Sequence, residues 1–248
     1  MPRGSSPAPP RYTGAMTDGW DTFSVPFTTS TPVACRPGPE AEAPLVVLCH
    51  GMGETPGLAR KAWPRLLSLP VHVVAPRGPH GFEVREDGAI RIGGAWYLYD
   101  GGPEWFRETV IRSADWLRGA LDAVEAERGW RPRERALVGH SQGAYFGYVA
   151  ALRNQDRFRR LVAAAGRLKT AFLTGELAAP GPLHTLILHG ERDRHVRPAA
   201  AERTLDTLRN AGYAAELRWT PGGHRVSPEM DAAAAQWLSR AWSLTGPS

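Results

Sequence analysis

A serine between two glycines stands out among the residues of this chain that could do chemistry. Residues 139–143 read Gly-His-Ser-Gln-Gly, after the apolar run 136–138 and before a run of aromatic and small residues, 144–150. This order is typical of a short strand, a sharp turn and a helix, with Ser141 at the tip of the turn. Glycines on either side remove the β-carbons that would collide in such a turn. The pattern predicts an exposed nucleophile above the N-terminus of a helix, where negative charge is stabilised.

A serine hydroxyl becomes a good nucleophile only when a base takes its proton, and the base needs an acid that fixes its tautomer. Candidates for both roles follow later apolar runs: Asp193 comes after residues 186–188, and His224 comes after residues 217–219. In a parallel sheet, polar groups that follow the carboxyl ends of the strands meet at one edge. We therefore predict that Ser141 is the nucleophile, His224 the base and Asp193 the orienting acid, in the chain order serine, acid, histidine.

Other residues compete for these roles. Asp156 and Asp206 are alternative acids, but neither follows an apolar strand. His195 is the nearest alternative base, but it lies two residues from Asp193 in the same loop, which leaves no room for the three groups to line up. His189, Asp193 and His195 could also supply three metal ligands. Because three residues of one loop rarely complete a site, and no His-Glu-x-x-His or Cys-x-x-Cys motif is present, no metal site is predicted.

The segments that must position these residues alternate between strand and helix. Apolar runs predict strands at 45–48, 71–75, 136–138, 161–165, 183–189 and 214–219, and the remaining patterns predict helices at 58–69, 103–128, 198–211 and 227–244. Residues 22–33 suit antiparallel edge strands, and residues 77–102 are expected to be irregular. This alternation predicts an α/β fold, with a mostly parallel central sheet and helices on both faces.

The composition is that of an ordinary globular protein, with 42% hydrophobic and 22% charged residues. The start of the chain is rich in Pro, Gly, Ser and Arg, which predicts a disordered N-terminal extension at 1–20 and a single domain at 21–248. No apolar run approaches the roughly 18 residues of a membrane span. The first 16 residues lack the apolar core of a secretion signal, and Cys35 and Cys49 make no disulfide framework, so a cytoplasmic location is expected.

The positive charge of the chain gives little sign of a nucleic-acid partner. The net charge is +5, and it comes almost entirely from arginine, since Lys61 and Lys169 are the only lysines. The arginines are spread along the chain and interleaved with acidic residues, and no known nucleic-acid-binding motif is present. We therefore expect no nucleic-acid partner, and the sequence makes no prediction of the oligomeric state.

On these motifs the chain resembles the α/β-hydrolase superfamily of serine hydrolases, in particular the group of carboxylesterases, phospholipases and acyl-protein thioesterases. The resemblance runs from about residue 44 to the end and rests on four motifs in order: His-Gly-Met-Gly at 50–53, Gly-His-Ser-Gln-Gly at 139–143, His-Gly-x-x-Asp-x-x-Val at 189–196 and Gly-His at 223–224. It implies an acyl-enzyme on Ser141, with His224 as base and then acid, and Asp193 as the orienting carboxylate. It also implies an oxyanion hole made by the backbone N–H groups of Met52 and Gln142.

The chain departs from this family in its middle part. Thioesterase-like members carry a compact Trp-Phe-Asp segment, whereas residues 96–100 read Trp-Tyr-Leu-Tyr-Asp and are more aromatic. Trp96, Tyr97 and Tyr99 are candidates to line a substrate pocket, with core packing under a loop as the alternative. The segment between Arg167 and Pro182 is short, so no large cap domain is expected.

The predicted activity is hydrolysis of a small-molecule carboxylic ester or thioester. A nucleophile, a base and an oxyanion hole suffice for this chemistry, so no cofactor is expected. One alternative is a peptidase or amidase of the same fold. Another is a binding protein of this fold with little turnover, although such a protein has no need of an intact set of Ser141, Asp193 and His224.

Overall fold

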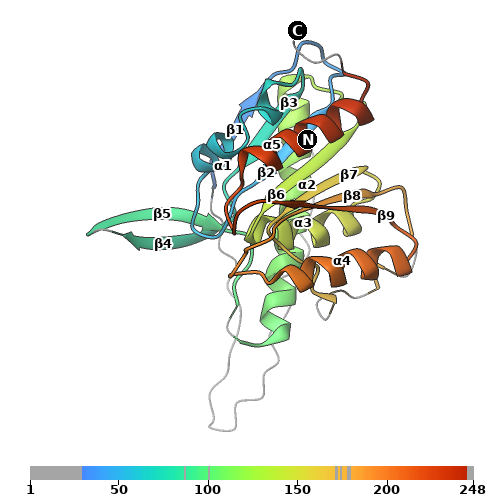
Figure 1. The fold of residues 1–248 in the computed structure, drawn as a ribbon. Helices are drawn as coiled ribbons and strands as arrows, with labels where there is room; N and C mark the ends of the chain where they lie inside the picture. The colour runs from blue at the N-terminus through green and yellow to red at the C-terminus, as the bar shows by residue number, and fades with distance from the viewer. Residues whose placement is uncertain are drawn as a thin grey trace. The chain divides into compact units, whose positions relative to one another are not determined.

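A twisted, mostly parallel sheet forms the centre of the computed structural model, which describes residues 30–86, 88–99, 101–170, 173, 175–177 and 180–244 (Figure 1). Within these residues the strand order is β1-β3-β2-β6-β7-β8-β9. β1 pairs antiparallel with β3, and the other pairings of this sheet are parallel. The mostly parallel sheet predicted from the sequence is therefore confirmed. Its strands are β1 (Val33–Arg36), β2 (Leu45–Cys49), β3 (His72–Pro76), β6 (Arg135–His140), β7 (Arg160–Ala164), β8 (His184–Gly190) and β9 (Ala214–Thr220).

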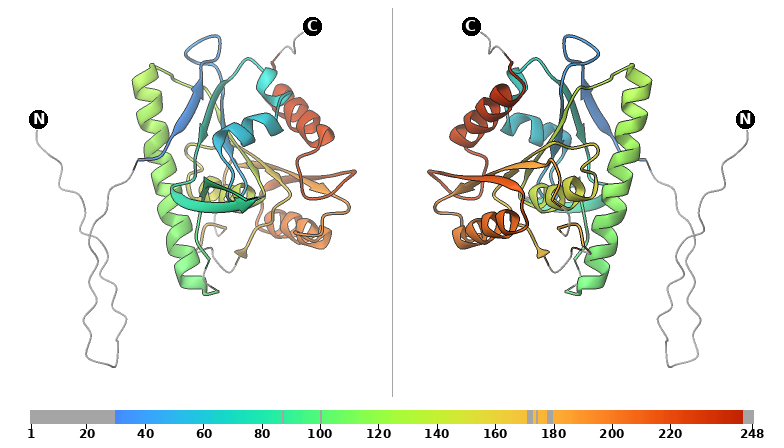
Figure 2. Two further views of the ribbon diagram at one scale, coloured as in Figure 1. Left: turned by 90° about the vertical axis from the view of Figure 1, so that its left-hand side faces the viewer. Right: turned by 90° about the vertical axis from the view of Figure 1, so that its right-hand side faces the viewer.

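Helices cover both faces of the sheet, as Figure 2 shows from two sides. The helices are α1 (Pro56–Ala62), α2 (Pro103–Arg128), α3 (Gln142–Arg153), α4 (Pro198–Asn210) and α5 (Pro228–Ala241). Side chains alternate along each strand, so Leu45 and Val47 pack into the core that contains α2, α3 and α4, whereas Val46 and Leu48 pack with α1 and α5. Burial on both faces explains why the central strands read as continuous apolar runs.

Helix α2 has the bounds that the sequence predicts. Proline stands in its first turn, where the missing N–H costs nothing, and Gly129 ends it with a left-handed φ of 65°. Phe106, Val110, Leu117 and Leu121 form a buried stripe at four- and seven-residue spacing. This long amphipathic helix therefore packs along the sheet beside α3, the helix that begins directly after Ser141.

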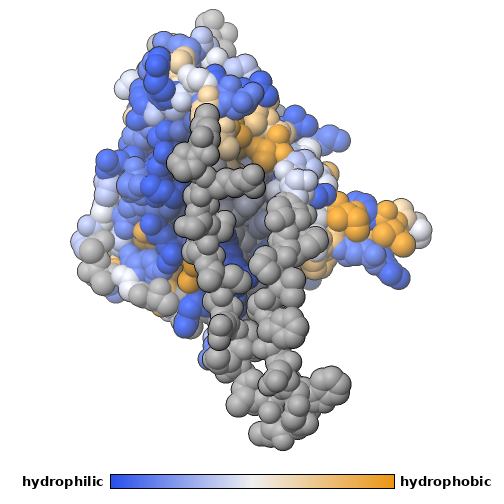
Figure 3. Space-filling model, turned by 180° about the vertical axis from the view of Figure 1, so that it is seen from behind, coloured by the Kyte–Doolittle hydropathy of each residue, from blue (hydrophilic) through white to orange (hydrophobic). Residues whose placement is uncertain are grey.

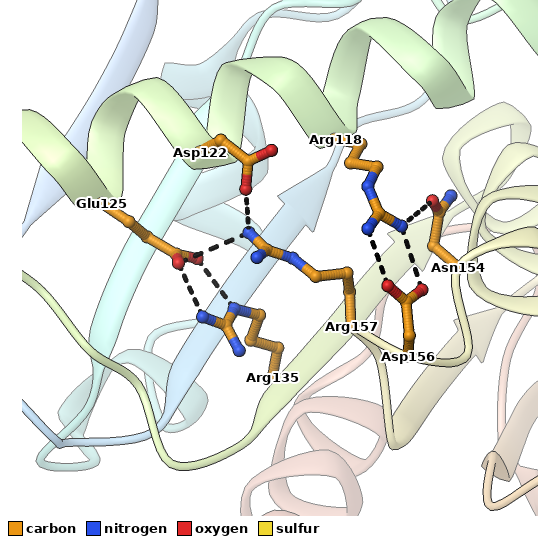
Figure 4. A network of polar contacts seen from close by, with 7 residues as sticks. All are labelled: Arg118, Asp122, Glu125, Arg135, Asn154, Asp156 and Arg157. Atoms are coloured by element: carbon orange, nitrogen blue, oxygen red, sulfur yellow. Dashed lines mark hydrogen bonds and ion pairs between the residues drawn. The ribbon is translucent and has the colours of Figure 1, made fainter.

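Ion pairs join α2 to the strand that leads to the serine (Figure 4). The Glu125 carboxylate accepts hydrogen bonds from Nε and Nη2 of Arg135 at 2.7 and 2.6 Å. Arg157, in the connection between α3 and β7, contacts Glu125 at 3.4 Å and Asp122 at 2.5 Å. Arg135 begins β6, so these pairs fix the start of the strand whose far end carries the serine turn. A second group of contacts beside them joins Arg118 to Asn154 and Asp156.

The expectation that residues 77–102 are irregular is wrong in part. Strands β4 (His80–Glu86) and β5 (Ala89–Ala95) pair antiparallel and project from the rest of the fold as a hairpin (Figure 1). Figure 3 shows hydrophobic residues gathered along this arm, where Ile90 and Ile92 are exposed. The base of the hairpin is joined to the loop after β2, because the Gly53 N–H donates to Gly94 O and the Gly94 N–H donates to Glu54 O, both at 2.9 Å.

Two further boundaries differ from the prediction. The helix expected at 58–69 is α1, which ends at Ala62, followed by a single 3₁₀ turn, η1 (Leu66–Ser68). Pro64 is the cause, since a proline disfavours helical angles in the residue before it, and Trp63 leaves the helix at φ −126° and ψ 52°. The edge strand begins at Val33, directly after Pro32, which has no N–H to donate. Residues 22–29 of the predicted edge strands, and the predicted extension at 1–20, lie outside the described residues.

No helix in the described part of the chain has the length and apolar character to cross a membrane.

Candidate active site

The turn between β6 and α3 holds Ser141 in a backbone conformation that residues other than glycine rarely adopt, with φ 51° and ψ −118°. Such strain costs about 1–3 kcal/mol and is common at functional sites. The flanking glycines allow the turn: a β-carbon on Gly139 would lie 2.3 Å from the carbonyl oxygen of Gly143, and one on Gly143 would lie 2.2 Å from that of Cys49. The Ser141 N–H donates to Ala164 O at 2.9 Å, which ties the turn to the end of β7.

The structure brings Ser141, His224 and Asp193 together at the carboxyl edge of the sheet. His224 Nε2 lies 2.8 Å from Ser141 Oγ, and His224 Nδ1 lies 2.9 Å from Asp193 Oδ2. Asp193 follows β8 and His224 follows β9. The two hydrogen bonds connect carboxylate to imidazole and imidazole to hydroxyl, which is the arrangement that a base-activated serine requires.

The Asp193 side chain is fully buried, and its carboxylate is held in its charged form. Burial alone would raise the pKa of Asp193, but hydrogen bonds from the Val196 N–H, the His224 ring and the His195 N–H outweigh it, so the pKa lies below its usual value. Oδ1 accepts the two backbone bonds at 2.8 and 2.9 Å, which leaves Oδ2 for the imidazole. The loop after β8 therefore holds the carboxylate at a fixed angle to His224.

The two other histidines beside His224 have different roles. His140 Nε2 donates to the backbone oxygen of His224 at 2.8 Å, so its side chain supports the loop that carries the imidazole. Burial lowers the pKa of His140, which favours the neutral ring. The His195 ring lies beside that of His224, with centroids 4.8 Å apart, but among the described contacts it makes no hydrogen bond to Ser141. Sequence reasoning missed the His140 bond, because no motif signals a bond to a backbone oxygen.

The two predicted oxyanion-hole residues come from different parts of the chain. Met52 follows β2, and Gln142 comes directly after Ser141 and begins α3. Within the described part of the chain, neither backbone N–H donates a hydrogen bond, so both donors are available to a bound oxygen. The loop of Met52 is anchored by His50, whose Nδ1 donates to Gly51 O at 2.6 Å and whose Nε2 accepts from the Gly78 N–H at 2.9 Å. Burial lowers the pKa of His50, consistent with this neutral tautomer.

A cavity of about 750 Å³ lies in front of Ser141. Tyr97 and Tyr99 line it, as expected, but the assignment of Trp96 to the substrate pocket is wrong. Trp96 is completely buried, stacks on Phe146 with centroids 4.6 Å apart and donates from Nε1 to His50 O at 2.8 Å. Its aromatic body and single donor fit the core beneath the site, so it supports the loop that carries Met52.

Gln142 has a second role that the sequence did not suggest. Its side-chain oxygen accepts a hydrogen bond from the backbone N–H of Trp96 at 2.9 Å, and its side-chain nitrogen donates to the backbone oxygen of Tyr97 at 3.2 Å. The residue after the serine therefore fixes the segment that forms one side of the cavity. Further lining residues that carry no sequence signal are Phe82, Leu98, Trp105, Tyr145, Arg167 and Lys169.

Within the described residues, the histidines at the end of β8 and in the loop after it do not form a group that could hold a metal ion. His189 is fully buried, and its Nε2 donates to Val196 O at 2.8 Å and lies 3.6 Å from Asp193 Oδ2. In the ranges described above, no group of three or more His, Cys, Asp or Glu side chains could hold a metal ion.

Comparison with known proteins shows the family of the chain and the solved structures that share its fold. The sequence profile of the phospholipase/carboxylesterase family matches residues 32–241. The fold is similar to that of esterase PE8, at 22% identity and a TM-score of 0.70 over 86% of this chain and 99% of that one. It is also similar to a carboxylesterase from Mesorhizobium loti, at 19% identity and a TM-score of 0.66 over 81% of this chain and 90% of that one. A Bacillus cereus carboxylesterase is 20% identical, with a TM-score of 0.66 over 85% of this chain and 94% of that one.

No curated protein matches the chain by sequence. At these identities the solved structures show the fold, and the match to the family profile over most of the chain shows the family. The chain belongs to the phospholipase/carboxylesterase family of α/β-hydrolases, a family of esterase-type hydrolases.

Proposed function

We propose that this protein is a serine hydrolase that cleaves carboxylic esters or thioesters of small molecules through an acyl-enzyme on Ser141. The observation that supports the proposal is the aligned pair of hydrogen bonds, 2.9 Å from Asp193 to His224 and 2.8 Å from His224 to Ser141. We further propose that one domain, residues 21–248, carries the whole activity. We assign it to the cytoplasm, because Cys35 and Cys49 are free thiols.

The first half-reaction makes the acyl-enzyme. His224 Nε2 takes the proton of Ser141 Oγ as the oxygen forms a bond to the acyl carbon, and the carbonyl electron pair moves onto the carbonyl oxygen. The oxyanion accepts hydrogen bonds from the N–H groups of Met52 and Gln142, each worth about 3 kcal/mol of transition-state stabilisation. The bond from carbon to the leaving oxygen or sulfur then breaks, and the leaving group takes the proton from His224. Asp193 stabilises the imidazolium that exists between these steps.

The second half-reaction releases the acid. Water gives a proton to His224 Nε2 and attacks the acyl carbon, and the same two N–H groups hold the second oxyanion. Collapse of this intermediate expels Ser141 Oγ, which recovers its proton from His224. The residues of this chain thus supply each proton transfer, and the proposed reaction uses no cofactor.

Turnover of activated esters tests the proposal. The wild-type protein should hydrolyse para-nitrophenyl acetate or butyrate, and Ser141→Ala and His224→Ala should each lower kcat by several orders of magnitude, about 10³-fold or more. His195→Ala should lower it by less than about tenfold, because its ring makes no hydrogen bond to Ser141. A larger loss in His195→Ala than in His224→Ala would show that the base is misassigned.

Turnover of three acetyl compounds, an ester, a matched thioester and a matched anilide, shows which leaving group the protein prefers. Faster turnover of the ester or thioester supports the proposed class, whereas faster turnover of the anilide would favour the amidase alternative. A folded protein that turns over none of the three would favour the binding-protein alternative.

A further inference from the structure

The loop that carries Met52, residues 50–54, is held by hydrogen bonds on both sides of that residue; we call it the oxyanion loop. The Gly51 N–H donates to Glu54 Oε2 at 2.8 Å, and the Glu54 N–H donates back to Gly51 O at 3.1 Å. Within the described part of the chain, the N–H groups of Gly51, Gly53 and Glu54 all have acceptors, and that of Met52 has none. The donor that the loop leaves free is thus the one that the proposed oxyanion hole needs.

The peptide unit between Gly51 and Met52 sets the direction of this donor. A trans peptide unit is planar, so its N–H points opposite to its carbonyl oxygen. Gly51 O accepts hydrogen bonds from His50 Nδ1 at 2.6 Å and from the Glu54 N–H at 3.1 Å. The Met52 N–H, in the same peptide unit, therefore points away from both of these groups. A shift of the loop that turns Gly51 O turns the donor with it.

The hairpin β4–β5 holds the other end of the oxyanion loop. Besides the two backbone bonds through Gly94, the hairpin supplies Arg91, whose Nη1 donates to Gly53 O. Arg91 stands directly opposite Val84, and opposite residues of an antiparallel pair lie on the same face. A β-carbon on Gly53 would lie 2.8 Å from Cγ2 of Val84, so this face of the hairpin is the one that meets the loop.

The hairpin and the loop approach each other at two glycines. A β-carbon on Gly93 would lie 1.9 Å from Gly53 O and 2.9 Å from Glu54 O. Gly53 itself has a left-handed φ of 72°. The two backbones come this close because neither glycine carries a side chain. A movement of the hairpin is therefore passed directly to the loop.

The Arg91 guanidinium is suited to hold the loop. Gly53 is buried, and within the described residues Arg91 supplies the one hydrogen bond to its carbonyl oxygen. A bond from a charged donor is stronger than a neutral one, and a buried acceptor that loses its donor has little water to replace it. The other terminal nitrogen of Arg91 lies 3.5 Å from Glu86 Oε2, where both side chains are well exposed, so this second contact is weak.

We propose that Arg91 is a positioning residue for the proposed oxyanion hole: it holds Gly53 O and fixes the oxyanion loop, so that the Met52 N–H is in place before the substrate binds. The inference rests on the proposed function, because the loop serves the same reaction. Arg91 is not among the described residues that line the cavity in front of Ser141, so it acts through the loop. A donor that is already in place needs no reorganisation in the transition state.

Steady-state hydrolysis of para-nitrophenyl butyrate measures this role. Arg91→Leu should lower kcat about tenfold and change KM by less than about twofold, because an oxyanion donor acts in the transition state and not on the bound ester. Arg91→Lys keeps a charged donor and should retain at least about half of the wild-type kcat. Arg85→Leu is the matched control, because it removes an exposed arginine of the same hairpin that pairs with Glu83, and its kcat should stay within about twofold of wild type.

A second pair of variants tests the contact without removing a charge. Gly93→Ala places a β-carbon against Gly53 O and should lower kcat about tenfold or more, since small displacements of catalytic groups are costly. Gly81→Ala adds the same carbon to β4, where it meets no atom within 4 Å, and should leave kcat within about twofold of wild type. Equal kcat in Gly93→Ala and Gly81→Ala, or in Arg91→Leu and Arg85→Leu, would overturn the proposal.

Inhibition by hexyl trifluoromethyl ketone distinguishes positioning from a loss of stability. Ser141 Oγ adds to the ketone carbon, its proton moves to His224, and the resulting oxyanion accepts the same N–H groups as the acyl transition state. The inhibition constant of Arg91→Leu should therefore rise by about the factor by which kcat/KM falls. A variant that only unfolds more readily would lose active molecules and keep the inhibition constant of wild type, and that result would overturn the proposal.

Hydrogen exchange separates failure of this inference from failure of the proposed function, because it needs no turnover. Amide hydrogens of peptides that cover residues 50–55 should exchange about tenfold faster in Arg91→Leu than in wild type, and at the wild-type rate in Arg85→Leu. This result supports the hold of Arg91 on the loop even if every ester is left intact. Unchanged exchange in a folded Arg91→Leu protein that hydrolyses esters would overturn the positioning role and leave the hydrolase proposal standing.

Discussion

Ser141 is held in strained backbone angles by neighbours from several parts of the chain. Its N–H is bonded to the end of β7, and its hydroxyl lies 2.8 Å from a histidine 83 residues further along. That histidine is supported twice, by Asp193 at its ring and by His140 at its backbone oxygen. The residue next to the nucleophile therefore helps to position the base, and this can be tested.

His140→Leu removes the donor to the His224 carbonyl and should lower kcat about fivefold to tenfold with little change in KM, since the lost bond is worth about 1 kcal/mol and acts through the placement of the base. His140→Gln keeps a donor and should retain more of the activity. The measurement is steady-state kinetics on a neutral para-nitrophenyl ester. Equal kcat for wild type and a folded His140→Leu protein would show that His140 only packs beside the turn.

For single residues, the sequence predicts those that belong to a motif and misses those whose position depends on packing. Ser141, Asp193 and His224 stand out, because each follows an apolar strand and the three are in one chain order. Arg167 and Lys169 do not stand out, because their place in the cavity depends on the left-handed Ala165 and on Gly166, which fits against α3. A single sequence carries no pattern for such a close approach.

The elements that support the site are joined by polar contacts as well as by the core. Glu125 on α2 receives two charged hydrogen bonds from Arg135 at the start of β6, and the side chains are only 10% and 16% exposed. The pairs therefore lie where solvent screens them little. Arg157 also contacts Glu125 and keeps its ion pair with Asp122 when this carboxylate is removed, whereas Arg135 loses the carboxylate that it pairs with.

Glu125→Gln should lower the free energy of unfolding by about 3 kcal/mol, because it breaks a half-buried network and leaves unpaired charge behind. Glu42→Gln is the matched control: it breaks the exposed pair with Arg131, whose side chains are 77% and 55% exposed, and should change the free energy by less than about 1 kcal/mol. Denaturant unfolding followed by circular dichroism measures both. Similar losses in the two variants would show that the network adds no more than a surface ion pair.

Element boundaries follow from the sequence where one pattern persists and fail where it is short. The periodic stripe of α2 continues for 26 residues, and its bounds are predicted correctly. The hairpin β4–β5 is missed, because its strands carry charged residues and three glycines, although the Asp87-Gly88 pair between alternating residues is a hairpin signal. The strand that carries exposed Ile90 and Ile92 also does not look like a core element.

On the scale of the whole molecule, the parallel sheet gathers the polar residues at one edge. Met52, Ser141, Asp193 and His224 each follow a different strand, β2, β6, β8 and β9, and are separated by up to 172 positions in the chain. The site therefore depends on the intact sheet. The charge of Asp193 also links the site to the stability of the whole protein. The buried carboxylate of Asp193 has a pKa below its usual value.

A carboxylate with a depressed folded-state pKa stabilises the protein above its unfolded pKa, near 3.9, and this contribution is lost as the pH falls through the folded value. The free energy of unfolding of wild type should therefore fall more steeply than that of Asp193→Asn between about pH 5 and about pH 2. Urea unfolding at several pH values measures the difference. A difference in the free energy of unfolding between wild type and Asp193→Asn that stays constant across this range would contradict a lowered pKa of Asp193.

The central claim is that the aligned histidine activates Ser141, and covalent labelling with a fluorophosphonate probe tests it most directly. Intact mass followed by peptide mapping should find one adduct, on Ser141, absent from Ser141→Ala and formed far more slowly by His224→Ala. Labelling at another residue, or a folded wild-type protein that neither reacts with the probe nor hydrolyses an activated ester, would contradict the account.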